Sequence, residues 1–362
     1  MKKRICLIGG EDVHKRIALS RYLIEADFDV TILGTSTNEF PDDITYIQYN
    51  LVRHFSPVAD RKTIQWYRRY FSENQFDLIH TFDTKPAFLV PWALKKSSIP
   101  ICRTITGLGT IFMSDKPFYY LLRETYYFLH RRVKHRVFKT VFQNYDDCEL
   151  YKSHDLITKD NYELIFSSGI ELKSITRKAP RNNTRFTFVF VARLVYEKGV
   201  INLLEAARIC RNKGHDFRIQ LIGPLEEDSK RLNQSILDHY KNDVEILGQR
   251  DDVYDLLCDA DAFVLPTFRE GFARVLLEAA AFGLPIIATN VTGVREFVRH
   301  EKEGLLVTVK NSDALAEAMI RLATDKALAL HLAENALKHV EKFSLENVSK
   351  QYINIFNEAI NQ

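Results

Sequence analysis

The feature that most restricts the fold of this chain is a short apolar run followed by a loop and then by a helical apolar face. The run covers residues 262–265, and its length and composition predict a strand buried in a parallel sheet. Gly271 lies where we expect the loop to become a helix, because Leu276, Leu277 and Ala280 then share one helical face. A strand, a loop and a helix in this order predict an α/β fold.

Similar apolar runs recur along the whole chain and alternate with helical segments. Runs of this kind cover residues 4–8, 29–34, 76–81, 99–105, 139–144, 164–170, 186–194, 217–223 and 244–248. Because 362 residues are too many for one typical domain, we expect two doubly wound parallel-sheet domains. The polar segment 173–185 is the expected linker, and the last helix is expected at 344–360.

Two acidic residues flank the expected start of the helix after Gly271. Glu270 precedes this glycine, and Glu278 is expected about two turns into the helix. A helix N-terminus offers free N–H groups and a positive dipole end, which favour a phosphate group. Ionised carboxylates accept hydrogen bonds from hydroxyl groups, so the two glutamates could hold a sugar and a ribose. For an isolated pair at this spacing, two solvated glutamates on a surface helix are the alternative.

The residues that follow extend this pattern into a recognisable motif. Residues 283–296 contain G-L-P-I-I-A-T and G-V-R-E, and residues 303–307 read E-G-L-L-V. This sequence resembles the nucleotide-sugar half of the retaining glycosyltransferases of family 4. The resemblance covers nearly all of 186–310 and, more loosely, 1–170. It is closer to members that extend a lipid-linked glycan from a nucleotide sugar.

The resemblance implies the GT-B fold, in which two Rossmann-like doubly wound parallel-sheet domains face a cleft. It places an acceptor-binding domain at 1–172, completed by a C-terminal helix at 345–362. It places the nucleotide-sugar-binding domain at 173–344. The glycines after the first strand do not form G-x-G-x-x-G, so a dinucleotide fingerprint is not expected.

The resemblance also implies roles for individual residues. Arg193 and Lys198, within A-R-L-x-x-x-K-G, would neutralise the departing diphosphate, where negative charge develops in the transition state. Glu270 would hold hydroxyls of the donor sugar, which completes the expected catalytic set. The residues implied for donor binding are Gly271, Phe272, Arg274, Glu278, Arg250, Gly9 and Gly10.

Candidates for acceptor contact lie after strands of the first half, since the carboxyl ends of parallel strands line the ligand crevice. They are His14, His80, Asp83, Lys85 and Thr106. A purely structural role is the alternative for each. Many relatives carry a histidine where this chain has Thr106, so no catalytic histidine is assigned there.

Residues 117–138 combine aromatic and aliphatic side chains with a late cluster of cations. Seven basic residues and one acidic residue lie within 116–139, although the net charge of the whole chain is only +3. This local basicity argues against a nucleic-acid protein and favours contact with an anionic membrane surface. The expected contact residues are Arg131, Arg132, Lys134 and Arg136. A core-facing helix with a basic outer side is the alternative.

Other sequence features restrict the compartment and the chemistry. The five cysteines are dispersed without C-x-x-C, and no apolar run reaches about 20 residues, so we expect neither a disulfide framework nor a membrane span. The Asp259 and Asp261 pair precedes a strand, and we therefore expect no metal and no cofactor. A cytoplasmic protein on the inner face of the plasma membrane is expected.

The resulting hypothesis is a retaining transferase that moves a hexose or HexNAc from a UDP-sugar to a polyprenyl-diphosphate-linked saccharide. A family 4 relative with a soluble sugar acceptor is one alternative. A non-catalytic subunit that binds nucleotide sugars is another, since Thr106 replaces the usual histidine. The sequence leaves the identity of the donor sugar open.

Overall fold

The computed structural model describes residues 2–112, 116–176, 184–226 and 231–362. The chain forms two compact units, which are described separately. Unit 1 comprises Met1–Gly169 and Leu345–Gln362, and unit 2 comprises Ile170–Ser344. The boundary thus lies three residues before the one expected from the sequence. Residues 177–183 of the expected linker lie outside the described residues.

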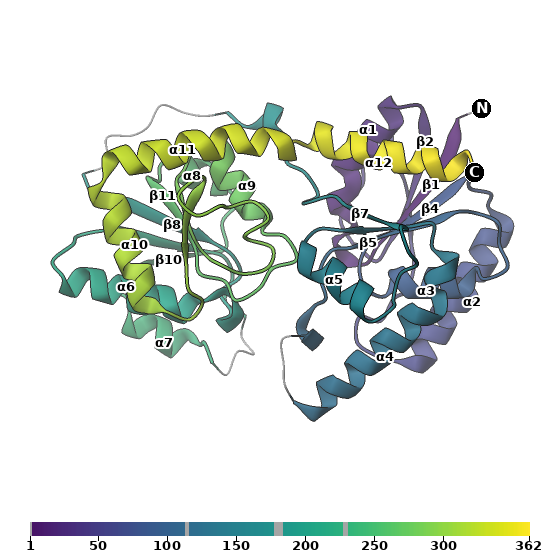
Figure 1. Ribbon diagram of the computed structural model, residues 1–362, viewed down its shortest axis with the longest axis horizontal. Coiled ribbons are helices and arrows are strands. Elements are labelled where there is room, and N and C mark those ends of the chain that lie inside the picture. The colour runs from purple at the N-terminus through teal and green to yellow at the C-terminus, as the bar shows by residue number, and fades with distance from the viewer. Residues whose placement is uncertain (1, 113–115, 177–183, 227–230) are drawn as a thin grey trace. The chain divides into compact units, whose positions relative to one another are not determined.

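Unit 1 contains a parallel sheet with strand order β3-β2-β1-β4-β5-β6-β7 (Figure 1). The strands are β1 Lys3–Ile8, β2 Phe28–Gly34, β3 Thr45–Gln48, β4 Leu78–Thr81, β5 Ile101–Ile105, β6 Lys139–Phe142 and β7 Tyr162–Leu164. The helices are α1 Ile17–Glu25, α2 Pro57–Glu73, α3 Pro86–Ala93, α4 Pro117–Val133, α5 Tyr145–Ser153 and α12 Leu345–Ile360.

Residues 5–8 of β1 are all apolar, without polar residues in alternation, because both faces of this part of the strand are buried. Ile5 and Leu7 enter one hydrophobic cluster, while Cys6 and Ile8 enter a second. Successive side chains of a strand point to opposite faces, so both faces of the unit 1 sheet are covered. This arrangement is the doubly wound α/β layer order predicted from the sequence.

Unit 2 contains a second parallel sheet, with strand order β10-β9-β8-β11-β12-β13. Its strands are β8 Thr187–Val191, β9 Arg218–Ile222, β10 Glu245–Gly248, β11 Ala262–Leu265, β12 Ile286–Thr289 and β13 Gly304–Val307. Its helices are α6 Val200–Asn212, α7 Gln234–His239, α8 Val253–Cys258, α9 Arg274–Ala281, α10 Ser312–Thr324 and α11 Lys326–Val340. The predicted class, two parallel-sheet α/β domains, is confirmed.

The last helix of the chain, α12, belongs to unit 1 and packs beside α1 (Figure 1). Its Tyr352 hydroxyl lies 3.1 Å from Thr104 Oγ1, which lies 2.7 Å from His80 Nε2. All three side chains are buried. A buried polar chain of this kind, closed by hydrogen bonds, fixes the helix to the carboxyl-terminal part of the sheet.

None of the helices in the described parts of the chain combines the length and the apolarity that crossing a membrane requires.

Candidate active site

Three loops at the carboxyl ends of β8, β11 and β12 pack against one another within unit 2. Gly199 has φ +72°, and a Cβ atom there would lie 1.9 Å from the carbonyl oxygen of Pro266. Gly293 has φ +80°, and a Cβ atom there would lie 2.5 Å from the carbonyl oxygen of Glu270. Only glycine permits this backbone conformation together with so close an approach. The loop from Pro266 to Ala273 is therefore held between its two neighbours.

Backbone hydrogen bonds complete this packing. The Phe268 N–H donates to the carbonyl of Glu197 at 2.9 Å, and the Glu270 N–H donates to the carbonyl of Thr292 at 3.0 Å. The Ala273 N–H donates to the carbonyl of Gly293 at 2.8 Å. Because these bonds join loops that are far apart in the sequence, they fix the direction in which Glu270 points.

Lys198 and Glu270, two members of the predicted catalytic set, form an ion pair. The Lys198 ammonium lies 2.5 Å from Glu270 Oε1, and the two side chains are 22% and 13% exposed. Partly buried charges are screened less by salt than exposed ones. The structure thus brings a cation and a carboxylate together at the carboxyl end of the unit 2 sheet.

The helix after this loop begins later than the sequence suggested. α9 starts at Arg274, with Ala273 as its N-cap, whereas Gly271 lies inside the loop. The prediction that Gly271 opens the helix was wrong, because the N–H groups of Glu270 and Ala273 bond to the loop after β12 instead. Glu278 consequently lies about one turn, not two, from the helix start.

Glu278 lies in a mainly buried environment on α9. Its side chain is 19% exposed, and Arg274 Nε lies 3.6 Å from its carboxylate. Burial raises the pKa of Glu278, and the Arg274 guanidinium opposes that rise. The predicted ribose ligand is thus a mainly buried carboxylate with a cation beside it.

The other long side chains predicted for the site in unit 2 are engaged within that unit. The Arg193 guanidinium pairs with Glu226, and the Arg250 side chain donates to both oxygens of Asp252 at 2.8 and 2.7 Å. The Asp252 carboxylate raises the pKa of Arg250. The Phe272 ring packs on Phe343, with 5.8 Å between centroids.

Sequence reasoning missed Glu226. A signal was present in the sequence, because residues 226–228 are Glu, Glu and Asp and follow a Gly-Pro pair at the end of an apolar run. Glu227 and Asp228 lie outside the described residues.

In unit 1, three acceptor-side or donor-side candidates meet at the ends of β1 and β4. Asp83 Oδ2 accepts a hydrogen bond from the Gly10 N–H at 2.8 Å, and Asp83 has φ +70°. The Tyr49 hydroxyl donates to the carbonyl of Gly9 at 2.8 Å. A non-glycine residue in the left-handed region stores strain that the surrounding structure must hold, and such residues cluster at functional sites.

His14 lies in a 3-10 helix, Glu11–Arg16, that follows β1, and Thr106 lies in the loop after β5; neither side chain is fully buried. His14 Nδ1 lies 3.2 Å from the carbonyl of Glu11. Both residues remain acceptor-side predictions.

His80 and Lys85 do not lie where an acceptor could reach them freely. The His80 side chain is fully buried, and burial lowers its pKa to about 3, so the imidazole is neutral at pH 7. The Lys85 ammonium contacts Asp60 at 2.6 Å and the carbonyl of His54 at 2.7 Å, and its side chain is only 12% exposed. The buried His80 is therefore not available for acceptor contact, and Lys85 ties the loop before α2 to that helix.

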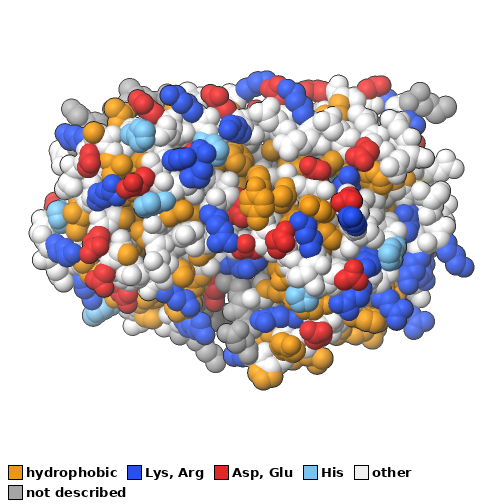
Figure 2. Space-filling view, in the orientation of Figure 1, with side chains coloured by type: hydrophobic (Ala, Val, Ile, Leu, Met, Phe, Trp, Pro, Cys, Tyr) orange, Lys and Arg blue, Asp and Glu red, His pale blue; other side chains and the backbone are white. Residues whose placement is uncertain are grey.

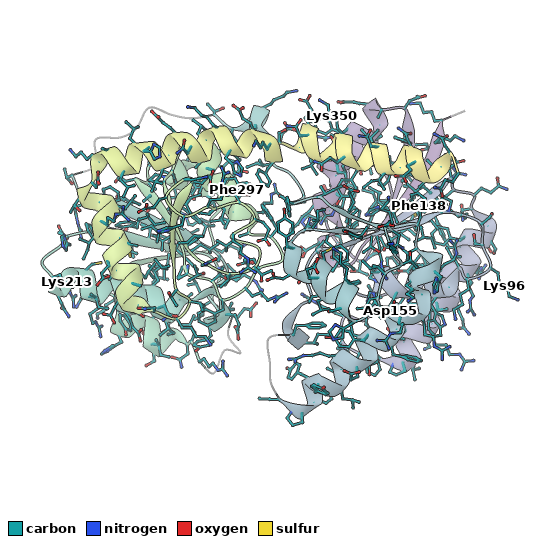
Figure 3. All side chains as sticks on the ribbon, viewed as in Figure 1. Lys96, Phe138, Asp155, Lys213, Phe297 and Lys350 are labelled. Carbon is teal, nitrogen blue, oxygen red and sulfur yellow. The ribbon has the colours of Figure 1, made fainter. Side chains whose placement is uncertain are left out.

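The predicted membrane-contact cations split into two groups. Lys134 lies 2.5 Å from Asp155 Oδ1, and Asp155 is labelled in Figure 3. Arg136 donates to the carbonyls of Leu94 and Ile99 at 2.9 and 2.5 Å, and burial lowers its pKa. Both side chains are partly buried and bonded within unit 1, so they are less available to a membrane surface than the sequence suggested.

The other two cations are exposed, although Arg131 also donates to the carbonyl of His154 at 2.9 Å. Arg131 and Arg132 are both exposed, and the Arg132 guanidinium lies 5.0 Å from the centroid of the Phe128 ring. The exposed apolar side chains of α4 are Phe118, Tyr120, Leu121 and Phe128. Figure 2 shows hydrophobic side chains gathered over the start of α4. The outer face of α4 is thus apolar at its beginning and basic at its end.

Among the described residues, no group of three or more His, Cys, Asp or Glu side chains has the arrangement of a metal site.

Comparison with known families matches both halves of the chain. The profile described as "Glycosyltransferase Family 4" matches residues 17–140, and "Glycosyl transferases group 1" matches residues 173–339. The chain belongs to the family 4 glycosyltransferases. The A-R-L-x-x-x-K-G and E-G loops, which carry Lys198 and Glu270, lie within the second match.

Two curated relatives of this glycosyltransferase are named for sugar transfer to a diphosphoundecaprenol acceptor and for capsular polysaccharide biosynthesis. An Escherichia coli UDP-Gal:alpha-D-GlcNAc-diphosphoundecaprenol alpha-1,3-galactosyltransferase is 25% identical over 91% of this chain and 90% of its own. The Staphylococcus aureus capsular polysaccharide biosynthesis glycosyltransferase CapM is 31% identical over 48% of this chain and 47% of its own. The chain thus matches about half the length of CapM and most of the length of the E. coli enzyme.

Solved structures with the same fold align over nearly the whole glycosyltransferase. A glycosyltransferase from Rickettsia africae has a TM-score of 0.80 at 19% identity and covers 100% of this chain and 99% of its own. Anabaena HepE in complex with UDP has a TM-score of 0.77 at 17% identity, over 98% and 100% of the two chains. Together with the two parallel sheets, these matches confirm the predicted GT-B fold.

Proposed function

We propose that this glycosyltransferase moves a hexose or HexNAc from a UDP-sugar to a saccharide linked to undecaprenyl diphosphate, and that the anomeric configuration is retained. The ion pair of Lys198 and Glu270, inside the family 4 donor motif, is the observation that carries this proposal. Unit 2 would hold the donor, and unit 1 the acceptor. The reaction would need no metal, since Arg193, Lys198 and the α9 N-terminus supply positive charge.

Each residue has a defined part in this mechanism. An acceptor hydroxyl oxygen bonds to the anomeric carbon while the bond from that carbon to the phosphate oxygen breaks. The electron pair leaves with UDP, where Lys198 and Arg193 stabilise it, and the phosphate takes the hydroxyl proton on the same face. Glu270 would fix the sugar hydroxyls, and Glu278 the ribose.

Names of relatives support a lipid-linked acceptor. The E. coli relative acts, by its name, on an undecaprenol-diphosphate sugar with UDP-Gal as donor. A relative from Campylobacter jejuni, 30% identical over 48% of this chain, is named for a diphospho-undecaprenol acceptor and transfers N-acetylgalactosamine. These names differ in the donor sugar, so the donor of this chain is a question for experiment.

The test combines binding and turnover. A thermal-shift panel of UDP-sugars selects the donor, and the purified protein is then offered that donor with a lipid-linked acceptor or with free sugars. We expect transfer to the lipid-linked acceptor, with an α-linkage from an α-linked donor by NMR, and unchanged rates in EDTA. Transfer to free sugars alone would favour the soluble-acceptor alternative. Binding without any turnover would favour the non-catalytic subunit.

We expect the outer face of α4 to bind an anionic bilayer on the inner side of the plasma membrane. Phe118 and Leu121 are both 65% exposed on the first turns of the helix. Burial of two such side chains in the interface should contribute about 2–4 kcal/mol. Phe118→Ser with Leu121→Ser should therefore lower binding to phosphatidylglycerol vesicles at least about tenfold, measured by co-sedimentation.

A matched control is Leu330→Ser on α11 of unit 2, where the leucine is 62% exposed. It should leave vesicle binding unchanged. If the Phe118 and Leu121 double variant bound vesicles as tightly as the wild type, α4 would not be the membrane-contacting surface.

A further inference from the structure

Both cations that would neutralise the donor diphosphate are already paired with carboxylates in unit 2. Lys198 contacts Glu270, and Arg193 pairs with Glu226. The mechanism gives Glu270 a task with the sugar, whereas it gives Glu226 none. An acidic side chain beside a phosphate-binding arginine opposes the anionic ligand that this arginine is expected to bind.

Backbone contacts between two neighbouring loops place Glu226 beside Arg193. The Leu194 N–H donates to the carbonyl of Pro224 at 2.8 Å, and Leu194 and Leu225 form an isolated parallel bridge beyond the ends of β8 and β9. Gly223 has φ +138°, and a Cβ atom there would lie 1.9 Å from the carbonyl oxygen of Ala192. The two loops therefore run side by side, and Glu226 is carried to Arg193.

The exposure of the pair allows a ligand to compete for the arginine. The Arg193 and Glu226 side chains are 60% and 48% exposed. Exposed ion pairs contribute little stability, so an incoming diphosphate with two or more negative charges can displace one carboxylate. A buried pair in the same place would resist this exchange.

We infer that Glu226 is a competing counter-ion for Arg193: it holds the guanidinium while the donor site is empty, yields it to the diphosphate of the UDP-sugar, and takes it back as UDP leaves. This inference rests on the proposed function, because it assumes that Arg193 faces the diphosphate. The consequence is a donor site that binds the UDP-sugar and also releases UDP readily. Glu226 weakens the hold on donor and product equally, through the charge it places on one shared cation.

The test measures binding of UDP and uridine by calorimetry to the wild type and to Glu226→Gln. The substitution keeps the shape and removes the charge. We expect UDP to bind Glu226→Gln about two- to fivefold more tightly at low salt, and the difference to shrink at high salt. Uridine, which has no phosphate, should bind both proteins equally. In steady state, the inhibition constant of UDP and the KM for the donor should fall by the same factor.

Glu245→Gln is the matched control. Glu245 pairs with Arg218 through a 2.9 Å contact with similar exposure, but at the amino-terminal ends of β9 and β10. It should leave the UDP affinity unchanged. Equal or weaker UDP binding by Glu226→Gln, or an equal gain for uridine, would overturn the inference while leaving the glycosyltransferase proposal standing. A wild type that binds no UDP would overturn both.

Discussion

Glu270→Gln should lower kcat for sugar transfer about 100- to 1,000-fold, equivalent to about 2.7–4 kcal/mol of transition-state stabilisation. The neutral amide cannot accept hydrogen bonds from sugar hydroxyls as strongly as a carboxylate does, and it releases the Lys198 ammonium from its 2.5 Å contact. UDP, which lacks the sugar, should bind within about threefold of the wild type. Single-turnover transfer and calorimetry with UDP measure the two quantities separately.

Two results would contradict this assignment of Glu270. A kcat within about threefold of the wild type would show that its carboxylate does not act on the transferred sugar. A parallel loss of UDP affinity would show that the substitution disturbs the loop between Pro266 and Ala273, whose backbone bonds hold Glu270 in place. Equal melting temperatures of the two proteins are required for either conclusion.

Lys198→Met should lower kcat/KM about 100-fold or more, because the methionine keeps most of the unbranched side chain but removes the cation that stabilises the departing diphosphate. UDP binding should weaken as well, which distinguishes this variant from Glu270→Gln. Lys213→Met is the control. It removes an exposed lysine at the C-terminal end of α6, labelled in Figure 3, and should leave both kcat/KM and the UDP affinity unchanged.

The double variant Lys198→Met with Glu270→Gln tests whether the two residues act together. Side chains in direct contact give effects that do not add, so the double variant should lose much less than the product of the two single losses. Full additivity would mean that the ion pair has no part in the transfer step. A Lys198→Met variant with normal kcat/KM would remove the lysine from the mechanism.

The repeating apolar runs predicted the fold because they are short and because the central strands β5, β11 and β12 are buried along their whole length, as expected for a parallel sheet covered by helices on both sides. The family motif placed Lys198 and Glu270 in one site, although 72 positions separate them in the sequence. The start of α9 was missed, since N–H groups near Gly271 bond to the loop after β12. The local sequence does not show that a loop far away in the chain will accept hydrogen bonds from these N–H groups.

Charged side chains gave the least reliable predictions. Arg136 looks like a solvated cation in the sequence, yet its two acceptors are carbonyls 42 and 37 positions earlier. His80 follows an apolar run, but it is part of β4 and faces Tyr352 of α12, far away in the sequence. Asp83, two residues beyond the strand, is the side chain that reaches the Gly10 N–H. Strand-end position alone does not tell which side of the sheet a residue faces.

The place of α12 has a consequence for how the protein is made. Val348, Tyr352, Ile355 and Phe356 of this helix share a hydrophobic cluster with Ile5 and Leu7 of the first strand. On the ribosome, the half that is synthesised first therefore waits for residues 345–362 before its interior can close, while unit 2 has its whole sequence beforehand. During that interval the nascent amino-terminal half leaves exposed the apolar side chains that α12 covers in the finished protein.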